Sequence, residues 1–274
     1  MTIPFFAAAA VFAALIWAVA IDATIWQAAL FCLGMFIALQ LLFILIVLIY
    51  NACLSSDVPI KKINKLCRFL LPHISRIICF WAGADITVRG LEKLPEERFL
   101  MVCNHKSMFE AISFYSALKN YDIGYVSKAS NLKIPVVGNL AIQTGTLAID
   151  RENNRNAMKT IITAADYIKS GMCSMFIYPE GTRSKTGKLG TFHAGSFKIA
   201  QKAKCPVVIT AVQGAENVVK KLPLNTIRRT KITLDILECV SAEKVCEMTT
   251  AELSDYARGL IATFIGEDGM VNAE

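Results

Sequence analysis

Residues 99–110 read FLMVCNHKSMFE, and this stretch decides the fold. Its first five residues are all apolar, as in a strand that is buried on both faces of a sheet. Polar residues 104–107 then end the strand, and residues 108–118 fit a helix. A buried strand that turns directly into a helix is the repeating unit of an α/β domain with a largely parallel sheet.

The same alternation continues along residues 85–274, over which we expect an α/β domain with a largely parallel, buried sheet flanked by helices. The predicted strands are 86–89, 99–103, 123–127, 146–149, 174–178, 207–211 and 232–237. The predicted helices are 108–118, 155–169, 196–204 and 251–264. Ligands of such sheets collect beyond the carboxyl ends of the strands, so functional residues should follow strands directly.

The first fifty-six residues are of a different kind, since Asp22 is the only charged side chain among residues 1–56. Two apolar runs, 3–21 and 23–50, lie on either side of it, and only Gln27 and Gln40 interrupt the second. Because a membrane span needs about 20 apolar residues, we predict a membrane-embedded helical hairpin over 1–56. A cleaved signal peptide is the alternative, but it would begin with a basic segment, and none is present.

Residues 57–84 combine apolar and basic side chains in a helical pattern. The apolar residues recur at steps of three and four: Ile60, Ile63, Leu66, Leu70, Ile74 and Ile77. The basic residues between them are Lys61, Lys62, Lys65, Arg68 and Arg76. This pattern predicts a basic amphipathic helix, kinked at Pro72, at the bilayer surface. The alternative is a helix that packs on the domain and exposes a solvated charged face. Positive charge directly after a membrane helix predicts that the domain lies in the cytoplasm.

Cysteine usage agrees with a cytoplasmic domain. The nine cysteines are an odd number, and no two form a Cys-x-x-Cys pair. They read as reduced thiols used as small apolar residues, and we expect neither disulfides nor a zinc site.

Two nucleotide-related functions are not expected. The chain carries a net charge of +7, but it has no motif of an RNA- or DNA-binding fold, so nucleic acid is not an expected partner. The segment 181–188 superficially resembles a phosphate-binding P-loop. Five residues instead of four separate Gly181 from Gly187, and Leu189 stands where serine or threonine is required, so nucleotide hydrolysis is excluded.

His105 and Glu110 lie on either side of the junction between the 99–103 strand and the helix that follows it. A carboxylate on one ring nitrogen of a histidine fixes the tautomer and leaves the other nitrogen free to take a proton. Two plainer interpretations remain open at this point. Ser107-x-x-Glu110 is also a capping box, in which the glutamate only serves the helix start, and His105 is then a hydrogen-bonded loop histidine.

Two more polar blocks follow predicted strands. Residues 145–151, GTLAIDR, end a short strand with an acid and Arg151. Residues 178–184, YPEGTRS, place a proline, a turn glycine and Arg183 directly after another strand. An arginine suits phosphate because its planar fork donates two parallel hydrogen bonds. Taken alone, the first block also fits an exposed charge pair and the second a plain polar turn.

Taken together and in order, the three blocks resemble the signature blocks of the glycerolipid acyltransferase family, most of all those of bacterial 1-acylglycerol-3-phosphate O-acyltransferases. That family carries Asn-His, four residues and Asp, then a Gly-x-x-x-Ile-Asp-Arg-like block, then Phe-Pro-Glu-Gly-Thr-Arg-Ser. A fourth, apolar block contains a proline, which matches Pro206, so the resemblance covers 104–209. The chain departs from the pattern with Glu110 for Asp, Tyr178 for Phe and Ile209 where a second proline is common.

The resemblance implies transfer of a fatty acyl group from acyl carrier protein or coenzyme A to the sn-2 hydroxyl of lysophosphatidic acid, giving phosphatidic acid. His105 is then the catalytic base and Glu110 its carboxylate partner. The implied substrate-binding residues are Glu180, Gly181, Thr182, Arg183 and Arg151. Neither a cofactor nor a metal is expected, and the expected partners are lysophosphatidic acid, the acyl donor and membrane lipids.

The resemblance also predicts a bacterial inner-membrane location, with the active domain on the cytoplasmic face. Two alternatives stay open. One is an acyltransferase for another acceptor, such as lyso-ornithine lipid or a lysophospholipid. The other is a catalytically inactive module that binds membranes.

Overall fold

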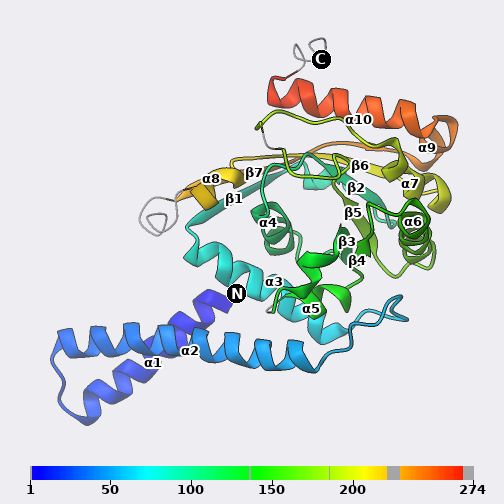
Figure 1. Ribbon diagram of the computed structural model, residues 1–274. Helices are drawn as coiled ribbons and strands as arrows, with labels where there is room; N and C mark the ends of the chain where they lie inside the picture. The colour runs from blue at the N-terminus through cyan, green and yellow to red at the C-terminus, as the bar shows by residue number, and fades with distance from the viewer. Residues whose placement is uncertain (1, 136, 185, 221–228, 268–274) are drawn as a thin grey trace. The chain divides into compact units, whose positions relative to one another are not determined.

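The structure is a computed structural model that describes the chain except residues 1, 136, 185, 221–228 and 268–274 (Figure 1). The chain forms two compact units, Met1–Leu54 and Ser55–Glu274. The three-part division predicted from the sequence, at residues 56 and 84, stays a prediction. We describe each unit by itself.

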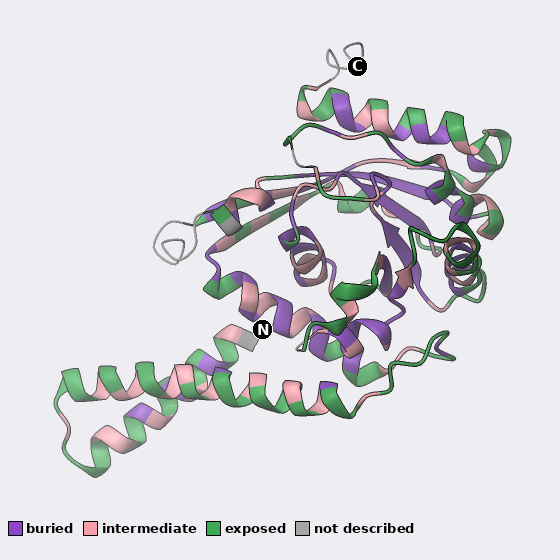
Figure 2. Cartoon of the chain, viewed as in Figure 1, coloured by how far each residue is buried: buried purple, intermediate pink, exposed green. Residues whose placement is uncertain are grey.

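The first unit is a hairpin of two apolar helices, α1 (Thr2–Ala20) and α2 (Ile25–Cys53). Asp22, the predicted turn residue, adopts a left-handed backbone with φ of +51°, and Thr24 then begins α2 with a reciprocal cap to Gln27. Both helices are long and apolar enough to cross a membrane, and most of their surface is exposed within the chain (Figure 2). The predicted helical hairpin is therefore confirmed.

The second unit contains a seven-stranded sheet in the order β1-β7-β6-β2-β5-β3-β4. The strands are β1 (Ala84–Arg89), β2 (Leu100–Cys103), β3 (Ile123–Lys128), β4 (Leu147–Ile149), β5 (Ser174–Ile177), β6 (Val207–Gln213) and β7 (Thr230–Val240). All neighbours pair in parallel except β6 and β7, which are antiparallel. All seven predicted strands are present, so the largely parallel sheet is confirmed.

Helices cover both faces of this sheet (Figure 1). The four predicted helices of the domain are α4 (Phe109–Ala117), α6 (Asn154–Lys169), α7 (Lys198–Ala203) and α10 (Thr250–Ile265). Among the described residues, the domain has three short α-helices that were not predicted: α5 (Gly138–Ile142), α8 (Ala215–Lys220) and α9 (Ala242–Glu247).

The central strand β2 is buried along its whole length, because successive side chains enter two cores. Leu100 and Val102 join the core under α6, α7 and α10, whereas Met101 and Cys103 join the core under α4 and α8. The carboxyl end of β2 is therefore held from both sides at the point where the polar block 104–107 begins.

The predicted amphipathic segment forms α3 (Lys65–Trp81), which runs through Pro72. Leu70, Ile74 and Ile77 are buried in the second unit, where α3 contacts α4, α5 and β1. This is the packing that the plainer of the two interpretations predicts. Leu66 and Phe69 remain 48% and 56% exposed, and contact of this helix with a bilayer stays a prediction.

Candidate active site

The site begins where β2 ends, at a fully buried asparagine. The Asn104 side chain donates to the Val212 carbonyl at 2.9 Å and accepts from the Val212 N–H at 2.9 Å. A side-chain amide offers both a donor and an acceptor, so it substitutes for the main chain of one more strand residue. This fixes the turn that carries His105 against the neighbouring strand β6.

His105 and Glu110 lie together. His105 Nδ1 is 2.7 Å from Glu110 Oε2, and the other carboxylate oxygen, Oε1, accepts the N–H groups of Lys106 and Ser107, each at 2.8 Å. Glu110 is therefore not confined to the helix start, because one oxygen accepts the two main-chain N–H groups and the other contacts the histidine. A catalytic role of the pair stays a prediction. Glutamate is longer than the aspartate usual in the family, and α4 begins at Phe109, close enough for the longer side chain to reach the ring.

The Glu110 carboxyl is almost completely buried, with 1% of the side chain exposed. Burial raises its pKa, while the hydrogen bond from His105 and those from the Lys106 and Ser107 N–H groups oppose that rise. The ionised carboxylate requires hydrogen on Nδ1, which leaves the lone pair of the imidazole on Nε2.

The ring of His105 is held flat against Tyr178, with centroids 4.0 Å apart and planes 18° from parallel. The side chain is 17% exposed, and among the residues that the structure describes nothing hydrogen-bonds to Nε2. One ring nitrogen is therefore oriented by Glu110, and the other is free to exchange a proton with a bound molecule.

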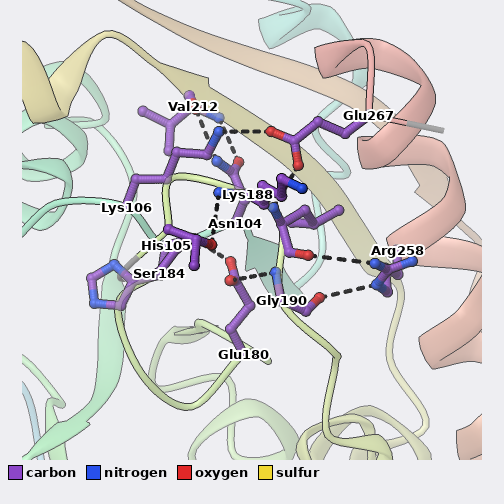
Figure 3. Close-up of polar contacts among 12 residues, drawn as sticks. Asn104, His105, Lys106, Glu180, Ser184, Lys188, Gly190, Val212, Arg258 and Glu267 are labelled. Carbon is purple, nitrogen blue, oxygen red and sulfur yellow. Dashed lines mark hydrogen bonds and ion pairs between the residues drawn. The ribbon is translucent and has the colours of Figure 1, made fainter. Parts of the chain in front are cut away.

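Glu180 connects the His block to the loop that follows β5. Its Oε1 accepts the His105 N–H at 2.6 Å, and its Oε2 accepts the Gly190 N–H at 2.9 Å (Figure 3). A third link runs from the Ser184 N–H to the His105 carbonyl at 2.9 Å. Burial raises the pKa of the Glu180 carboxyl. Both of its oxygens serve main-chain donors, so binding of substrate by Glu180 stays a prediction.

The other predicted residues of this block lie at the surface of the same turn. Gly181 has φ of +69° and its N–H donates to the Tyr178 carbonyl at 3.0 Å, which closes a tight turn. Thr182 and Arg183 are exposed. The guanidinium of Arg183 is thus available to an anion beside the turn, but it is not part of the cavity described next.

A cavity of about 720 Å³ opens beside Tyr178. Its apolar wall is formed by Val126, Ile149, Met158, Ile161 and Ile177. Its polar rim includes four of the predicted residues and four others: Glu180, Gly181, Thr182, Arg151, Asn154, His193, Ser196 and Lys198. Partial removal from water lowers the pKa of the Arg151 guanidinium. A cavity with an apolar wall and basic side chains on its rim suits an amphiphile with an anionic head.

His193 and Lys198, two of the four rim residues that were not predicted, bring further basic groups to the cavity. The His193 N–H donates to the Pro179 carbonyl at 2.9 Å, and its ring lines the cavity beside Gly181. Lys198 begins α7 and belongs to none of the signature blocks. No sequence signal marks either residue, because only the packing of the 191–198 segment beside the 178–182 turn brings them to the site.

Comparisons with known proteins agree with the motifs. Residues 85–213 match the family model "Acyltransferase". The chain is 26% identical to the 1-acyl-sn-glycerol-3-phosphate acyltransferase of Haemophilus influenzae, across 84% of this chain and 96% of that protein. It is 33% identical to a chloroplast protein of the same name from Brassica napus, across 49% of this chain and 40% of that protein.

A yeast relative of the same name, from Saccharomyces cerevisiae, is 26% identical across 72% of this chain and 64% of that protein. The chain thus spans only about half of the length of several curated relatives that it matches. A crystal structure of PlsC from Thermotoga maritima, a 1-acyl-sn-glycerophosphate acyltransferase, has the same fold, with a TM-score of 0.60, 23% identity, and coverage of 84% of this chain and 89% of that one.

Residues 85–213 therefore match the acyltransferase family model, and the resemblance of the chain to the glycerolipid acyltransferases, which the motifs predicted, is confirmed.

Proposed function

We propose that the chain is a 1-acyl-sn-glycerol-3-phosphate acyltransferase, which moves a fatty acyl group from a thioester to the sn-2 hydroxyl of lysophosphatidic acid. The observation that carries the proposal is the His105–Glu110 pair, with 2.7 Å between Nδ1 and Oε2 and Nε2 left to a substrate. A histidine oriented in this way is a general base, which an inactive membrane-binding module would not need.

The proposed reaction is direct. Nε2 of His105 takes the proton of the sn-2 hydroxyl as its oxygen attacks the thioester carbonyl carbon. The carbon–sulfur bond then breaks, the acyl group stays on the glycerol oxygen, and the imidazolium returns the proton to the departing thiolate. Glu110 stabilises the imidazolium between these two transfers.

No protein nucleophile takes part in this scheme. Ser107 carries the hydroxyl nearest to His105 in the sequence, but the residue is only 5% exposed and its Oγ accepts the Phe109 N–H at 3.2 Å. These contacts support a role at the helix start, and we expect Ser107→Ala to be much milder than His105→Ala. An acyl group found covalently on Ser107 by intact-mass spectrometry would refute direct transfer.

The acceptor's phosphate is assigned to the basic groups around the 181–183 turn. Arg183 is exposed beside the turn, and Arg151 and Lys198 lie on the rim of the cavity. Arginine forks match phosphate oxygens, and the apolar wall behind them provides a surface for a hydrocarbon chain. This arrangement favours a lysolipid with a phosphate near its hydroxyl over an ornithine-based acceptor.

We also propose that the hairpin α1–α2 anchors the protein in a bacterial inner membrane, with the domain on the cytoplasmic side. The two apolar helices support membrane association. Lys61, Lys62 and Lys65 follow the hairpin directly and line an open, basic pocket. Basic residues next to a membrane helix stay on the cytoplasmic side and attract anionic headgroups.

The full-length protein in detergent tests the proposal. Radiolabelled acyl-coenzyme A is offered with lysophosphatidic acid, lysophosphatidylcholine or lyso-ornithine lipid in parallel reactions. We expect labelled phosphatidic acid as the main product. Faster acylation of lyso-ornithine lipid would overturn the assigned acceptor, and no acyl transfer to any acceptor, from either acyl-coenzyme A or acyl carrier protein, would overturn the reaction.

A further inference from the structure

Two charged side chains, Arg258 of the last helix α10 and Glu267 just after its end, contact the loop around Gly190 (Figure 3). Arg258 donates from Nε to the Gly190 carbonyl at 3.0 Å and from a terminal nitrogen to the Leu189 carbonyl at 3.4 Å. Glu267 accepts the Leu189 N–H at 2.5 Å and the Lys106 ammonium at 3.1 Å. Both side chains lie beyond the 85–213 family match and beyond every motif found in the sequence.

The two ends of α10 make it a fixed platform for these contacts. Thr249 and Glu252 cap its start reciprocally. At its end, Gly266 has φ of +76°, its N–H donates to the Thr263 carbonyl, and the Glu267 N–H donates to the Ala262 carbonyl. This pair of bonds is a Schellman motif, which reverses the chain after the helix. The position of Glu267 is thus set by the helix end.

The packing of α10 leaves it little freedom to move. Leu253, Ala257 and Ile261 are fully buried in the core beneath β2 and β6. Arg258 follows one of these anchors directly. The carboxylate of Glu267 and the guanidinium of Arg258 are therefore held at fixed places relative to the central strand.

The loop that they hold is the one that Glu180 links to the catalytic histidine. The Gly190 carbonyl accepts a hydrogen bond from Arg258, and the Gly190 N–H donates to Oε2 of Glu180. The other oxygen of Glu180 accepts the His105 N–H. A Cβ at position 190 would lie 2.8 Å from Glu180 Oε2, so any larger residue there would have to displace this carboxylate oxygen. Contacts from α10 thus continue through a single main-chain residue to the His block.

Glu267 reaches the His block by a second route as well. Its one oxygen holds the Leu189 N–H and its other oxygen pairs with the Lys106 ammonium, and Lys106 is the residue after His105. The side chains of Lys106 and Glu267 are 17% and 16% exposed, so the pair is largely shielded from water.

We propose that Arg258 and Glu267 are positioning residues that fix the 186–190 loop, and with it Arg183, relative to His105. This inference rests on the proposed acyl transfer. Loosening the loop displaces Arg183, which sits on the same connection between Glu180 and Gly190, whereas the His105–Glu110 pair keeps its own contacts. Displacement of a binding group by about 1 Å can cost up to about a hundredfold in rate.

Steady-state kinetics with both substrates varied test this role. For Arg258→Ala and Glu267→Ala we expect kcat/KM for lysophosphatidic acid to fall at least tenfold through a higher KM. The KM for the acyl donor and the pH profile of kcat should keep their wild-type values. Glu267→Gln retains an oxygen for the Leu189 N–H and should recover most of the loss, and the exposed Asp255→Asn on the same helix is the matched control.

The double variant separates positioning from general destabilisation. If both side chains act through the same loop, the Arg258→Ala/Glu267→Ala protein should lose little more than the worse single variant. Losses that multiply, or a lower kcat with both KM values unchanged, would overturn the proposal. If the alanine variants do not fold, Arg258→Lys, which replaces the planar guanidinium fork by a single ammonium, carries the same kinetic test.

Hydrogen exchange provides a readout independent of turnover. The Leu189 and Gly190 amides are both hydrogen-bonded in the intact network, so a peptide that contains them should exchange at least tenfold faster in Glu267→Ala than in wild type or Asp255→Asn. Unchanged exchange in Glu267→Ala would overturn the positioning role of Glu267, even if the enzyme is active. If the wild-type protein acylates no acceptor, but Glu267→Ala still speeds exchange of the loop amides, only the proposed function is overturned.

Discussion

Replacing Glu110 with glutamine separates the two tasks of this carboxylate, because each task uses a different oxygen. The Lys106 and Ser107 N–H groups both donate to Oε1, while His105 Nδ1 contacts Oε2. A glutamine that keeps its amide oxygen toward the two N–H groups turns its NH₂ group toward the ring. Nδ1 must then accept a hydrogen bond, and the hydrogen of the neutral imidazole moves to Nε2, where it blocks the base.

The expected fall in kcat follows from the loss of the charged hydrogen bond to the ring and of the correct imidazole tautomer. A hydrogen bond to a charged group contributes about 1.5–3 kcal/mol, which corresponds to roughly 10- to 150-fold in rate. General-base catalysis, worth about 10²- to 10⁴-fold, is lost with the wrong tautomer. We therefore expect kcat to fall by about 10²- to 10⁴-fold in Glu110→Gln. Since Oε1 keeps both main-chain donors, the free energy of unfolding should change by less than about 1 kcal/mol.

The assay measures kcat with labelled acyl-coenzyme A and lysophosphatidic acid, and unfolding in denaturant for the same preparation. Glu110→Ala is the contrasting variant, since it leaves three donors without the acceptor that they use, at a cost of about 1–3 kcal/mol each. A Glu110→Gln protein of wild-type stability that retains more than a tenth of the wild-type kcat would refute the orienting role of Glu110.

Three more perturbations test other parts of the site. Gly190→Ala places a Cβ 2.8 Å from Glu180 Oε2 and should lower the free energy of unfolding by about 1–3 kcal/mol in denaturant titrations, whereas Gly195→Ala, with open space around it, should be neutral. Arg183→Ala should raise the KM for lysophosphatidic acid at least tenfold in steady-state assays and leave that of the acyl donor unchanged; equal effects would remove Arg183 from the phosphate site. Because the folded-state pKa of Glu180 is raised above its ordinary value of 4.5, the folded protein binds the extra proton, and stability from this group is lost as the pH rises through that pKa. The melting temperature of wild type relative to Glu180→Gln should therefore increase as the pH is lowered from 7.5 to 5. A difference that does not change with pH would contradict the raised pKa.

Local sequence patterns were sufficient to predict most of the fold. The five apolar residues 99–103 predict a strand buried on both faces, and Met101 and Val102 indeed enter opposite cores. The direction of β7 was not foreseeable, because an apolar strand has the same pattern in parallel and antiparallel pairs. Helices such as α5, of five residues, are too short to show a hydrophobic period.

Some features of the site could be predicted from the sequence, and others depend on tertiary structure. His105 and Glu110 are five residues apart, and the sequence predicts their contact, but it does not show that the two carboxylate oxygens serve different partners. The sequence did not show that both carboxylate oxygens of Glu180 accept main-chain N–H groups, and substrate binding by Glu180 stays a prediction. Arg258 and Glu267 depend on the tertiary position of α10, which no local pattern encodes.

The central claim is that the imidazole of His105 removes the proton of the acceptor hydroxyl. The most direct measurement is the kcat of His105→Ala for acyl transfer to lysophosphatidic acid, compared with wild type and with His73→Ala, which removes a histidine from α3. We expect at least a hundredfold loss in His105→Ala and wild-type activity in His73→Ala. Near-normal turnover by a folded His105→Ala protein would contradict the account.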